Sequence, residues 1–306
     1  MRTYLGSFFR VILGISFLIS GILKLYPIEP FELNFIDLGV ANWYTAPYIA
    51  RLLMGTELFL GLLLLLNFYL KKFTLKATIF LLLFFTIYLL IQIIREGNSG
   101  NCGCFGTYLQ MTPGESILKN IVLIIIASIL YRTHVNSSPR IQRLGWPILL
   151  LASVISPFIL NPIDLKAASY RQPELTNFPF EPSLLYSDSL AHKPEVDISK
   201  GKHIVAFLSM TCSHCRTSAF KMHVIEKRHP EISFFMVLNG KESNLSSFID
   251  ETKASNVPHM ILNGMPFAKI TGGAVPVIYW IEDGIVVKKS NYISLEESSI
   301  LAWLNE

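Results

Sequence analysis

The sequence predicts an α-helical membrane bundle, made of a four-helix unit plus a fifth transmembrane helix, followed by an α/β domain. Three observations support this fold class. Of the 306 residues, 51% are apolar and only 16% are charged, and most of the apolar residues precede residue 162. After residue 182 the pattern changes to alternating strand and helix signals. Each part of the chain also carries one closely spaced pair of cysteines.

Five apolar runs with few charges form the predicted membrane part. Three of them reach the roughly 20 residues that a helix needs to cross a bilayer, and two are shorter. The runs are Tyr4–Leu25, Ala46–Leu70, Phe73–Ile94, Ile117–Tyr131 and Trp146–Leu160. The first run has the charge and length of a secretory signal peptide, but no small-residue cleavage site follows it, so we expect a retained helix. The expected segments are the four-helix unit at 1–135, the fifth helix at 136–162, a proline-rich linker at 163–182 and the α/β domain at 183–306.

Basic residues indicate how these helices are oriented, because Lys and Arg concentrate in cytoplasmic loops. The segments predicted to be cytoplasmic carry Arg2 and Arg10, then Lys71, Lys72 and Lys76, then Arg132, Arg140 and Arg143. The alternate loops carry Glu29, Glu32 and Asp37 in the first case, and Arg95, Glu96, Glu115 and Lys119 in the second. With five spans, these alternate loops and the α/β domain are extracytoplasmic, in a multi-pass protein of the cell inner (cytoplasmic) membrane. Without the fifth span the α/β domain would be cytoplasmic. The net charge of +4 predicts no nucleic-acid partner, because many basic residues lie in membrane loops.

The α/β part carries the motif Cys212-Ser213-His214-Cys215 between a strand and a helix. This order is typical of a redox-active pair. A helix N-terminus stabilises a thiolate through its unpaired N–H groups, so we expect Cys212 to attack and Cys215, one turn later, to resolve. His214 should stabilise the thiolate further. A structural disulfide and half of a zinc site are the alternatives.

Further strands and helices are expected around this motif. They are a strand at His203–Ser209, a helix at Thr217–Arg228, a strand at Ile232–Leu238, a helix at Leu245–Thr252, a hairpin of Val275–Trp280 with Ile285–Lys288, and a helix at Ser294–Leu304. Ser294 and Glu297 have capping-box spacing, which predicts Ser294 as the N-cap of the last helix.

The arrangement resembles the thioredoxin superfamily, through the Cys212–Cys215 motif and through Val275-Pro276 at the start of a later strand. The resemblance implies a thioredoxin-like fold in which Val275-Pro276 forms a cis-proline loop that faces the active pair and binds substrate backbone. Two positions depart from the family, because Ala206 replaces a frequent buried acid and Thr211 replaces the usual aromatic residue. Proton handling should therefore differ from that of thioredoxin itself.

A single glycine, Gly103, separates Cys102 from Cys104 in the second outer loop. A disulfide between such close cysteines requires a bent backbone, which glycine permits. A strained bond is easier to reduce, which favours disulfide exchange over a structural disulfide or half of a metal site. All four cysteines would then face the same oxidising compartment.

The first 160 residues resemble the MauE/DoxX family of redox-associated membrane proteins. The matching segments are Arg10–Gly14, Ser20–Lys24, Arg51–Glu57 and Cys102–Gly106. The resemblance implies a four-helix unit that acts with a thioredoxin-like (MauD/DsbA-like) partner, as MauE acts with MauD in maturing the small subunit of methylamine dehydrogenase. Here that partner is fused to the chain.

Glu57 requires a separate explanation because it lies within a predicted span, where an ionised group is costly unless paired. It either pairs with Lys24 or Arg51 as a structural bridge, or serves as a proton acceptor or quinone-site residue beneath the Cys102–Cys104 loop.

These features favour an oxidative relay. Extracytoplasmic protein thiols would reduce the Cys212–Cys215 pair, which would reduce the Cys102–Cys104 pair by intramolecular exchange, and the membrane unit would pass the electrons to a quinone. The predicted inner loops contain no cysteine, which argues against a cytoplasmic thiol as electron source. The alternatives are an extracytoplasmic reductase or isomerase, and a non-catalytic maturation factor that holds a client. We expect no covalent cofactor and no metal.

Overall fold

The structure is a computed structural model and describes residues 2–98, 102–107, 109, 111–133, 141–163, 173–185 and 197–306. The chain divides into two compact units, Met1–Ile163 and Asp164–Glu306. Of the predicted linker, residues 164–172 lie outside the described part, as does Arg140 between the fourth and fifth apolar runs.

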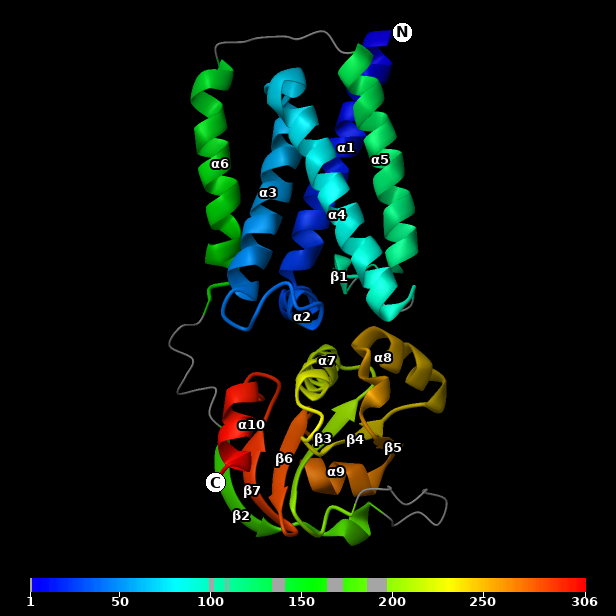
Figure 1. Cartoon of the computed structure of the whole chain (residues 1–306), viewed down its shortest axis with the longest axis vertical. Helices are drawn as coiled ribbons and strands as arrows, with labels where there is room; N and C mark the ends of the chain where they lie inside the picture. Colours follow the sequence, from blue (N-terminus) through cyan, green and yellow to red (C-terminus); the bar gives the residue numbers. More distant parts are fainter. Residues whose placement is uncertain are drawn as a thin grey trace. The chain divides into compact units, whose positions relative to one another are not determined.

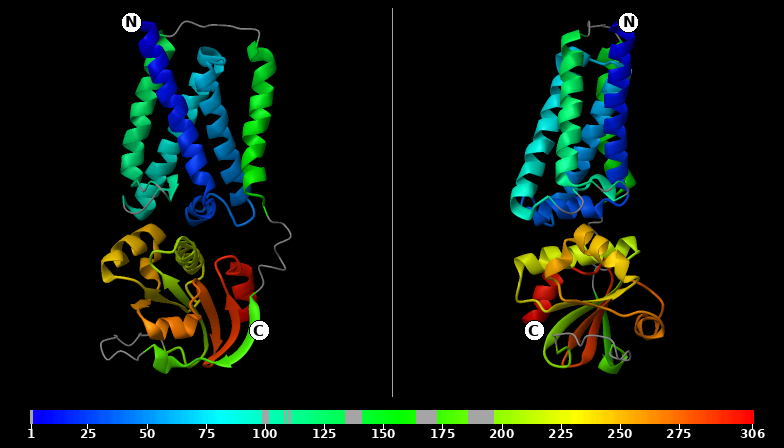
Figure 2. Two further views of the ribbon diagram at one scale, coloured as in Figure 1. Left: turned by 180° about the vertical axis from the view of Figure 1, so that it is seen from behind. Right: turned by 90° about the vertical axis from the view of Figure 1, so that its right-hand side faces the viewer.

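The first unit is a bundle of long apolar helices with a short helix and a short strand at one end (Figures 1 and 2). Its elements are α1 (Arg2–Leu25), α2 (Glu29–Asp37), α3 (Ala46–Leu66), α4 (Leu75–Glu96), β1 (Cys104–Thr107), α5 (Pro113–Thr133) and α6 (Ile141–Leu160). In the described residues α1, α3, α4 and α5 are long and apolar enough to span a membrane, and α6 carries a shorter apolar stretch. The predicted helical bundle is confirmed. A membrane crossing by α6 stays a prediction.

Glycines bring the backbones of α1 and α3 together. A Cβ atom on Gly14 would lie 2.7 Å from a Leu65 methyl carbon, and one on Gly61 would lie 2.9 Å from a Leu18 methyl carbon. On its other side α3 meets α6 equally closely, because a Cβ on Gly55 would lie 2.9 Å from the Ser153 carbonyl oxygen. Helices that associate in lipid use small residues in this way, to let their backbones approach closely.

The two ends of the bundle separate the loops that the charge pattern distinguished. The start of α1, the connection between α3 and α4, and the end of α5 lie at one end, while α2 and β1 lie at the other (Figure 1). Helix α2 was predicted as an acidic loop, yet Phe31, Phe35 and Ile36 are buried in it. Its nine residues are too few to show helical periodicity between the acidic positions. Which end faces the cytoplasm stays a prediction.

In the part of the chain that the structure describes, the second unit is built on a six-stranded sheet, with strand order β2-β7-β6-β3-β4-β5. Strands β3, β4 and β5 are parallel, and β6 runs antiparallel to β3. Its elements are β2 (Glu174–Pro179), β3 (Lys202–Ser209), α7 (Ser213–Arg228), β4 (Phe234–Asn239), α8 (Leu245–Thr252), β5 (His259–Ile261), α9 (Met265–Thr271), β6 (Val277–Glu282), β7 (Ile285–Ser290) and α10 (Glu297–Leu304). The predicted α/β, thioredoxin-like fold is confirmed.

Helices cover both faces of this sheet. Phe267 of α9 packs with Phe207 and Tyr279 on one face, and Trp303 of α10 packs against Trp280 on the other, with ring centroids 5.2 Å apart. The hairpin of β6 and β7 turns at Asp283 and Gly284, which both have positive φ. The predicted hairpin is therefore confirmed.

Two predictions in this unit were wrong at the edges of elements. Residues 174–179, assigned to the linker, form β2, which pairs with β7. The strand is mostly exposed and lies at the sheet edge, so it lacks the alternation that marks a half-buried strand. Ser294 does not cap α10, which begins at Glu297. Its hydroxyl instead accepts a hydrogen bond from the Asn291 N–H in a tight turn.

Candidate redox sites

The loop between β3 and α7 places Cys212 at the N-cap position of α7 and Cys215 in its first turn. Cys212 is half-buried and Cys215 is fully buried. The Ser209 N–H donates a hydrogen bond of 3.2 Å to Cys215 Sγ, yet burial outweighs it and raises the pKa of the Cys215 thiol. This difference in access supports the predicted roles, with Cys212 attacking and Cys215 resolving.

The predicted proline loop lies at the same end of the sheet as this pair. Val277 of β6 is opposite Phe207 of β3, so Pro276 lies level with the last residues of β3, just before the cysteine loop. The Val275–Pro276 peptide bond is cis, as the resemblance implied.

Two other residues support the cysteine loop and were not predicted. Arg216 donates from Nε and Nη2 to the Met210 carbonyl oxygen, at 3.1 and 2.9 Å, and forms an ion pair with Glu251 of α8. Tyr292, between β7 and α10, stacks on His214 with ring centroids 4.3 Å apart. No sequence motif marks either residue, because both act through contacts between distant segments.

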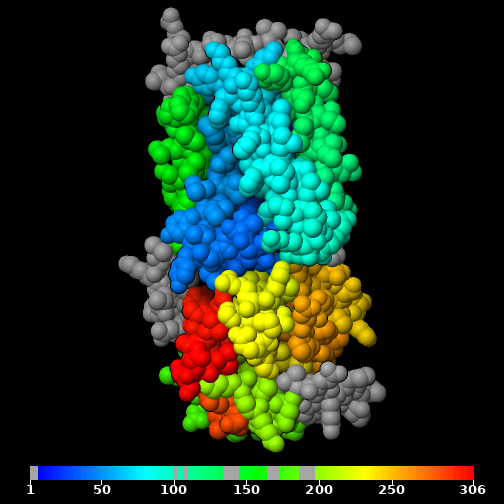
Figure 3. Space-filling view, in the orientation of Figure 1, coloured from blue at the N-terminus to red at the C-terminus, as the bar shows by residue number. Residues whose placement is uncertain are grey.

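The second pair lies in the loop between α4 and α5, where Cys102 and Cys104 are both buried. Cys102 Sγ lies 3.0 Å from Ser116 Oγ and accepts a hydrogen bond of 3.3 Å from the Cys104 N–H. Gly103 between them has φ +71°, the bent backbone that the spacing requires. A Cβ on Gly103 would lie 2.8 Å from Asn34 Nδ2, so α2 covers the loop. Figure 3 shows the segment that contains α2, in blue, at this end of the unit.

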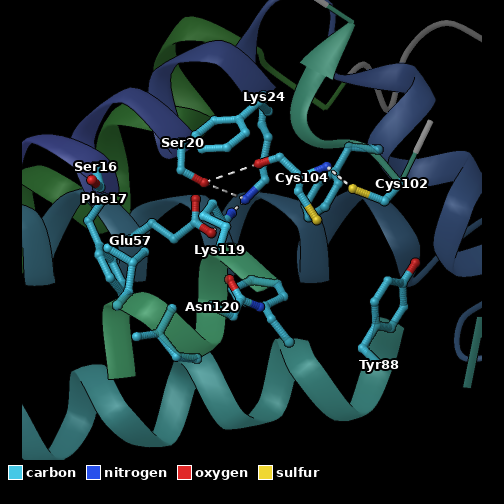
Figure 4. A pocket seen from close by; sticks show the side chains of 15 residues that line it. Ser16, Phe17, Ser20, Lys24, Glu57, Tyr88, Cys102, Cys104, Lys119 and Asn120 are labelled. Atoms are coloured by element: carbon cyan, nitrogen blue, oxygen red, sulfur yellow. Dashed lines mark hydrogen bonds and ion pairs between the residues drawn. The ribbon is translucent and has the colours of Figure 1, made fainter. Parts of the chain in front are cut away.

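Beneath the loop is a cavity of about 30 Å³, room for one or two water molecules (Figure 4). Lys24 of α1 and Glu57 of α3 form an ion pair of 2.5 Å inside it, which confirms one of the two predicted partners of Glu57. Lys24 Nζ also donates to Ser20 Oγ at 2.9 Å, and that hydroxyl donates to the Cys104 carbonyl oxygen at 3.1 Å. Both cysteines line this cavity.

The other predicted partner of Glu57 was wrong. Arg51 pairs instead with Glu32 of α2, at 2.5 Å, and its Nε donates to the Asn161 carbonyl oxygen at 2.7 Å. Six residues along a helix correspond to about 240° of rotation, which places Arg51 and Glu57 on different faces of α3. Arg51 therefore joins α2 and the end of α6 to α3, outside the cavity.

Helix α5 supplies Lys119, Asn120 and Leu123 to the cavity. Lys119 had been placed in the outer loop, but α5 begins at Pro113, so this residue lies in the second turn, with Nζ 4.2 Å from the centroid of the Phe105 ring. The sequence contains a signal for the earlier start. Thr112 and Glu115 form a reciprocal capping box, in which each backbone N–H donates to the other side chain.

The electrostatics of the two buried thiols differ. A hydrogen bond from the Cys102 thiol, together with the charges of Lys119 and Lys24, lowers the pKa of Cys104 to about 6. The same sulfur–sulfur hydrogen bond and burial raise the pKa of Cys102. A pair of this kind can hold one thiolate and one thiol. In the described part of the chain, no three His, Cys, Asp or Glu side chains form a metal-binding group.

Together, the apolar bundle and the two cysteine pairs define a membrane protein of the thiol–disulfide oxidoreductase class, with a thioredoxin-like domain. Residues 2–132 match the family described as "Methylamine utilisation protein MauE". Protein TlpB of Flavobacterium psychrophilum is 28% identical in an alignment 347 residues long, which covers 95% of this chain and 92% of that protein.

Two solved structures were also found to be similar. One is the thioredoxin domain of a thiol-disulfide oxidoreductase from Bacteroides vulgatus, with 16% identity, a TM-score of 0.31, and 36% of this chain and 83% of that chain covered. The other is a secreted disulfide oxidoreductase of Mycobacterium tuberculosis, with 13% identity, a TM-score of 0.29, and 34% and 81% covered.

Proposed function

We propose that this protein is an inner-membrane relay that oxidises extracytoplasmic protein thiols. Two thiols of a client reduce the Cys212–Cys215 disulfide, and the resulting thiols reduce the Cys102–Cys104 disulfide. The membrane pair then passes two electrons and two protons to a quinone-type acceptor, which becomes a quinol while the Cys102–Cys104 disulfide forms again. Each exchange breaks one S–S bond and forms another, so no further oxidant is needed until the quinone step.

The observation that carries this proposal is the placement of the membrane pair. Cys102 and Cys104 line a cavity inside the bundle, and Lys24, Lys119 and Glu57 line the same cavity. Charged groups inside a membrane bundle are costly and are characteristic of substrate or ion pathways and proton relays. The cavity thus joins thiol chemistry to ionisable groups within the apolar bundle.

The size of the cavity implies that the bundle must open before a quinone can react with the membrane pair. A volume of about 30 Å³ is too small for a quinone ring, so the acceptor reaches the pair only after the lining side chains move apart. We expect Phe31 and Phe85, which both lie about 5 Å from Lys24 Nζ, to move in this opening.

Reconstitution tests the relay directly. The purified chain in liposomes with a water-soluble quinone analogue and a reduced dithiol peptide should consume quinone in proportion to the peptide oxidised. The Cys102→Ser and Cys215→Ser variants should each stop quinone consumption. Absence of quinone-dependent oxidation in the intact chain would overturn the relay, and net reduction of an oxidised peptide by the membrane pair would favour a reductase.

A further inference from the structure

We propose that the two cysteines of the membrane pair have different, fixed roles: a partner thiolate attacks Cys102, and Cys104 leaves as a thiolate stabilised by Lys119. This assignment rests on the proposed function only in requiring that the pair exchanges disulfides. It adds Lys119, which no sequence motif marked, to the residues that serve the reaction.

The segment around Cys104 is the part of the loop that contacts the lysines. Its carbonyl oxygen is linked through Ser20 to Lys24, and the ring of the next residue, Phe105, lies beneath Lys119 Nζ at 4.2 Å. The Cys104 side chain points into the cavity that contains both lysines (Figure 4). A negative charge that develops on Cys104 is therefore formed beside two ammonium groups.

The charges in the cavity leave room for one more anion. The groups that line it and carry or can carry charge are Lys24 from α1, Glu57 from α3, Tyr88 from α4, Lys119 from α5 and the two cysteines. Glu57 is already paired with Lys24 through Oε1. No carboxylate of a described residue lies within ion-pair distance of Lys119. Lys119 is half-buried, and an ammonium group removed from water is costly without an anionic partner, so a thiolate at Cys104 would balance the positive charge of the cavity.

Cys102 has a different environment. Besides the Cys104 sulfur, its sulfur meets two neutral groups, the Ser116 hydroxyl at 3.0 Å and the Cys104 N–H at 3.3 Å. Neutral donors stabilise an anion less than ammonium groups do. After the hydrogen bond between the two sulfurs, the charges of Lys119 and Lys24 are further causes that lower the pKa of Cys104.

The exchange step follows from the rule that the thiol with the lower pKa leaves faster. The partner thiolate forms an S–S bond with Cys102 Sγ while the Cys102–Cys104 bond breaks, and its electron pair stays on Cys104. The second thiol of the partner, after losing its proton to solvent, attacks the partner's first sulfur and releases Cys102 as the second reduced sulfur. The partner is oxidised by two electrons and the membrane pair is reduced by two.

Mapping the first adduct tests the assignment. The full chain with Cys212→Ser and Cys215→Ser, oxidised at Cys102–Cys104, is treated briefly with reduced glutathione, quenched with acid and alkylated. Fragmentation of the Cys102–Cys104 peptide should show glutathione on Cys102 and the alkyl group on Cys104. The reverse pattern would overturn the assignment.

Lysine variants test the role of Lys119 in the same background. Lys119→Gln should slow reduction of the pair by glutathione by about ten-fold, because a poorer thiolate leaves more slowly. It should also shift the pH profile of Cys104 alkylation in a Cys102→Ser chain toward higher pH, a change that a merely structural role would not produce. Lys119→Arg keeps the charge and should retain most of the rate. Lys71→Gln is the matched control, because Lys71 also lies over an aromatic ring, that of Tyr131, but outside this cavity.

Unchanged kinetics in Lys119→Gln would remove Lys119 from the reaction. A chain that forms the glutathione adduct on Cys102 but never exchanges with Cys212 or a quinone would overturn the proposed relay and leave this assignment intact. The two proposals therefore fail separately.

Discussion

Lys24 and Glu57 form a 2.5 Å ion pair between α1 and α3, with side chains only 3% and 4% exposed. Glu57 Oε2 has no hydrogen-bond partner among the described residues, so the carboxylate is held by Lys24 alone. This pair connects the helices that line the cavity to the carbonyl oxygen of Cys104, through Ser20. Breaking this pair should leave a costly unpaired charge inside the bundle.

Removing one member of the pair should be worse than removing both. Lys24→Met or Glu57→Leu leaves an uncompensated buried charge and should destabilise the bundle by about 3–5 kcal/mol, whereas the double variant should lose much less. Thermal unfolding of the purified protein in detergent measures this difference. A double variant as unstable as the worse single variant would show that the ion pair is needed for more than charge balance.

Gly103→Ala should disturb the membrane pair for two reasons. Alanine is strained at φ +71°, and its Cβ would lie 2.8 Å from Asn34 Nδ2. We expect the Cys102–Cys104 disulfide to form more slowly, and trapping the free thiols at successive times measures its rate of formation. Gly97→Ala is the matched control, because Gly97 has φ +85° with no atom within 4 Å of its added Cβ.

Asn34→Ala should partly rescue Gly103→Ala by removing the amide that the new methyl group meets. If the double variant forms the disulfide no faster than Gly103→Ala does, backbone strain alone would explain the defect and close coverage by α2 would not.

The buried Cys215 thiol predicts a pH dependence of stability in the reduced thioredoxin-like domain. Burial raises its pKa in the folded state above the value in the unfolded chain. The folded state therefore binds this proton more tightly, and its stability should fall as pH rises above the ordinary pKa of a thiol, about 8.5. Urea unfolding of the reduced chain at pH 7 and pH 10, monitored by tryptophan fluorescence, measures this loss. Cys215→Ala should remove the added sensitivity, and an equal loss in that variant would assign it to other groups.

Cys215→Ser should trap Cys212 in mixed disulfides, because the resolving thiol is gone while the half-buried attacking thiol remains. Under the proposed relay, one of these adducts joins Cys212 to the membrane pair within the same chain. Non-reducing peptide mapping detects it. If only adducts with other proteins form, the two pairs do not exchange directly.

Labelling with a membrane-impermeant maleimide tests the topology. Cys212 should react from outside intact cells or spheroplasts, because five spans place the thioredoxin-like domain on that side. A single cysteine introduced at Lys72 should react only after the membrane is permeabilised. Protection of Cys212 would show that α6 does not carry the chain across the membrane.

The long elements could be predicted from the sequence because their signals are local. Apolar runs long enough to span a bilayer mark α1, α3 and α4, and α8 has the bounds predicted for it, Leu245–Thr252. Short or exposed elements were not predicted. Helix α2 is too short to establish a helical period, and edge strand β2 is almost wholly exposed. The start of α5 was placed late because its first turn is polar.

The sequence by itself determined the two cysteine pairs, the apolar bundle and the order of strands and helices around Cys212, because spacing and hydrophobic period are properties of neighbouring residues. Only the tertiary structure decided which charged groups meet. It paired Glu57 with Lys24 and directed Arg51 to Glu32. It also brought Lys119, 15 residues after Cys104 in the sequence, into the cavity that this cysteine lines. These relationships depend on which faces of separate helices pack together, and no local pattern encodes that.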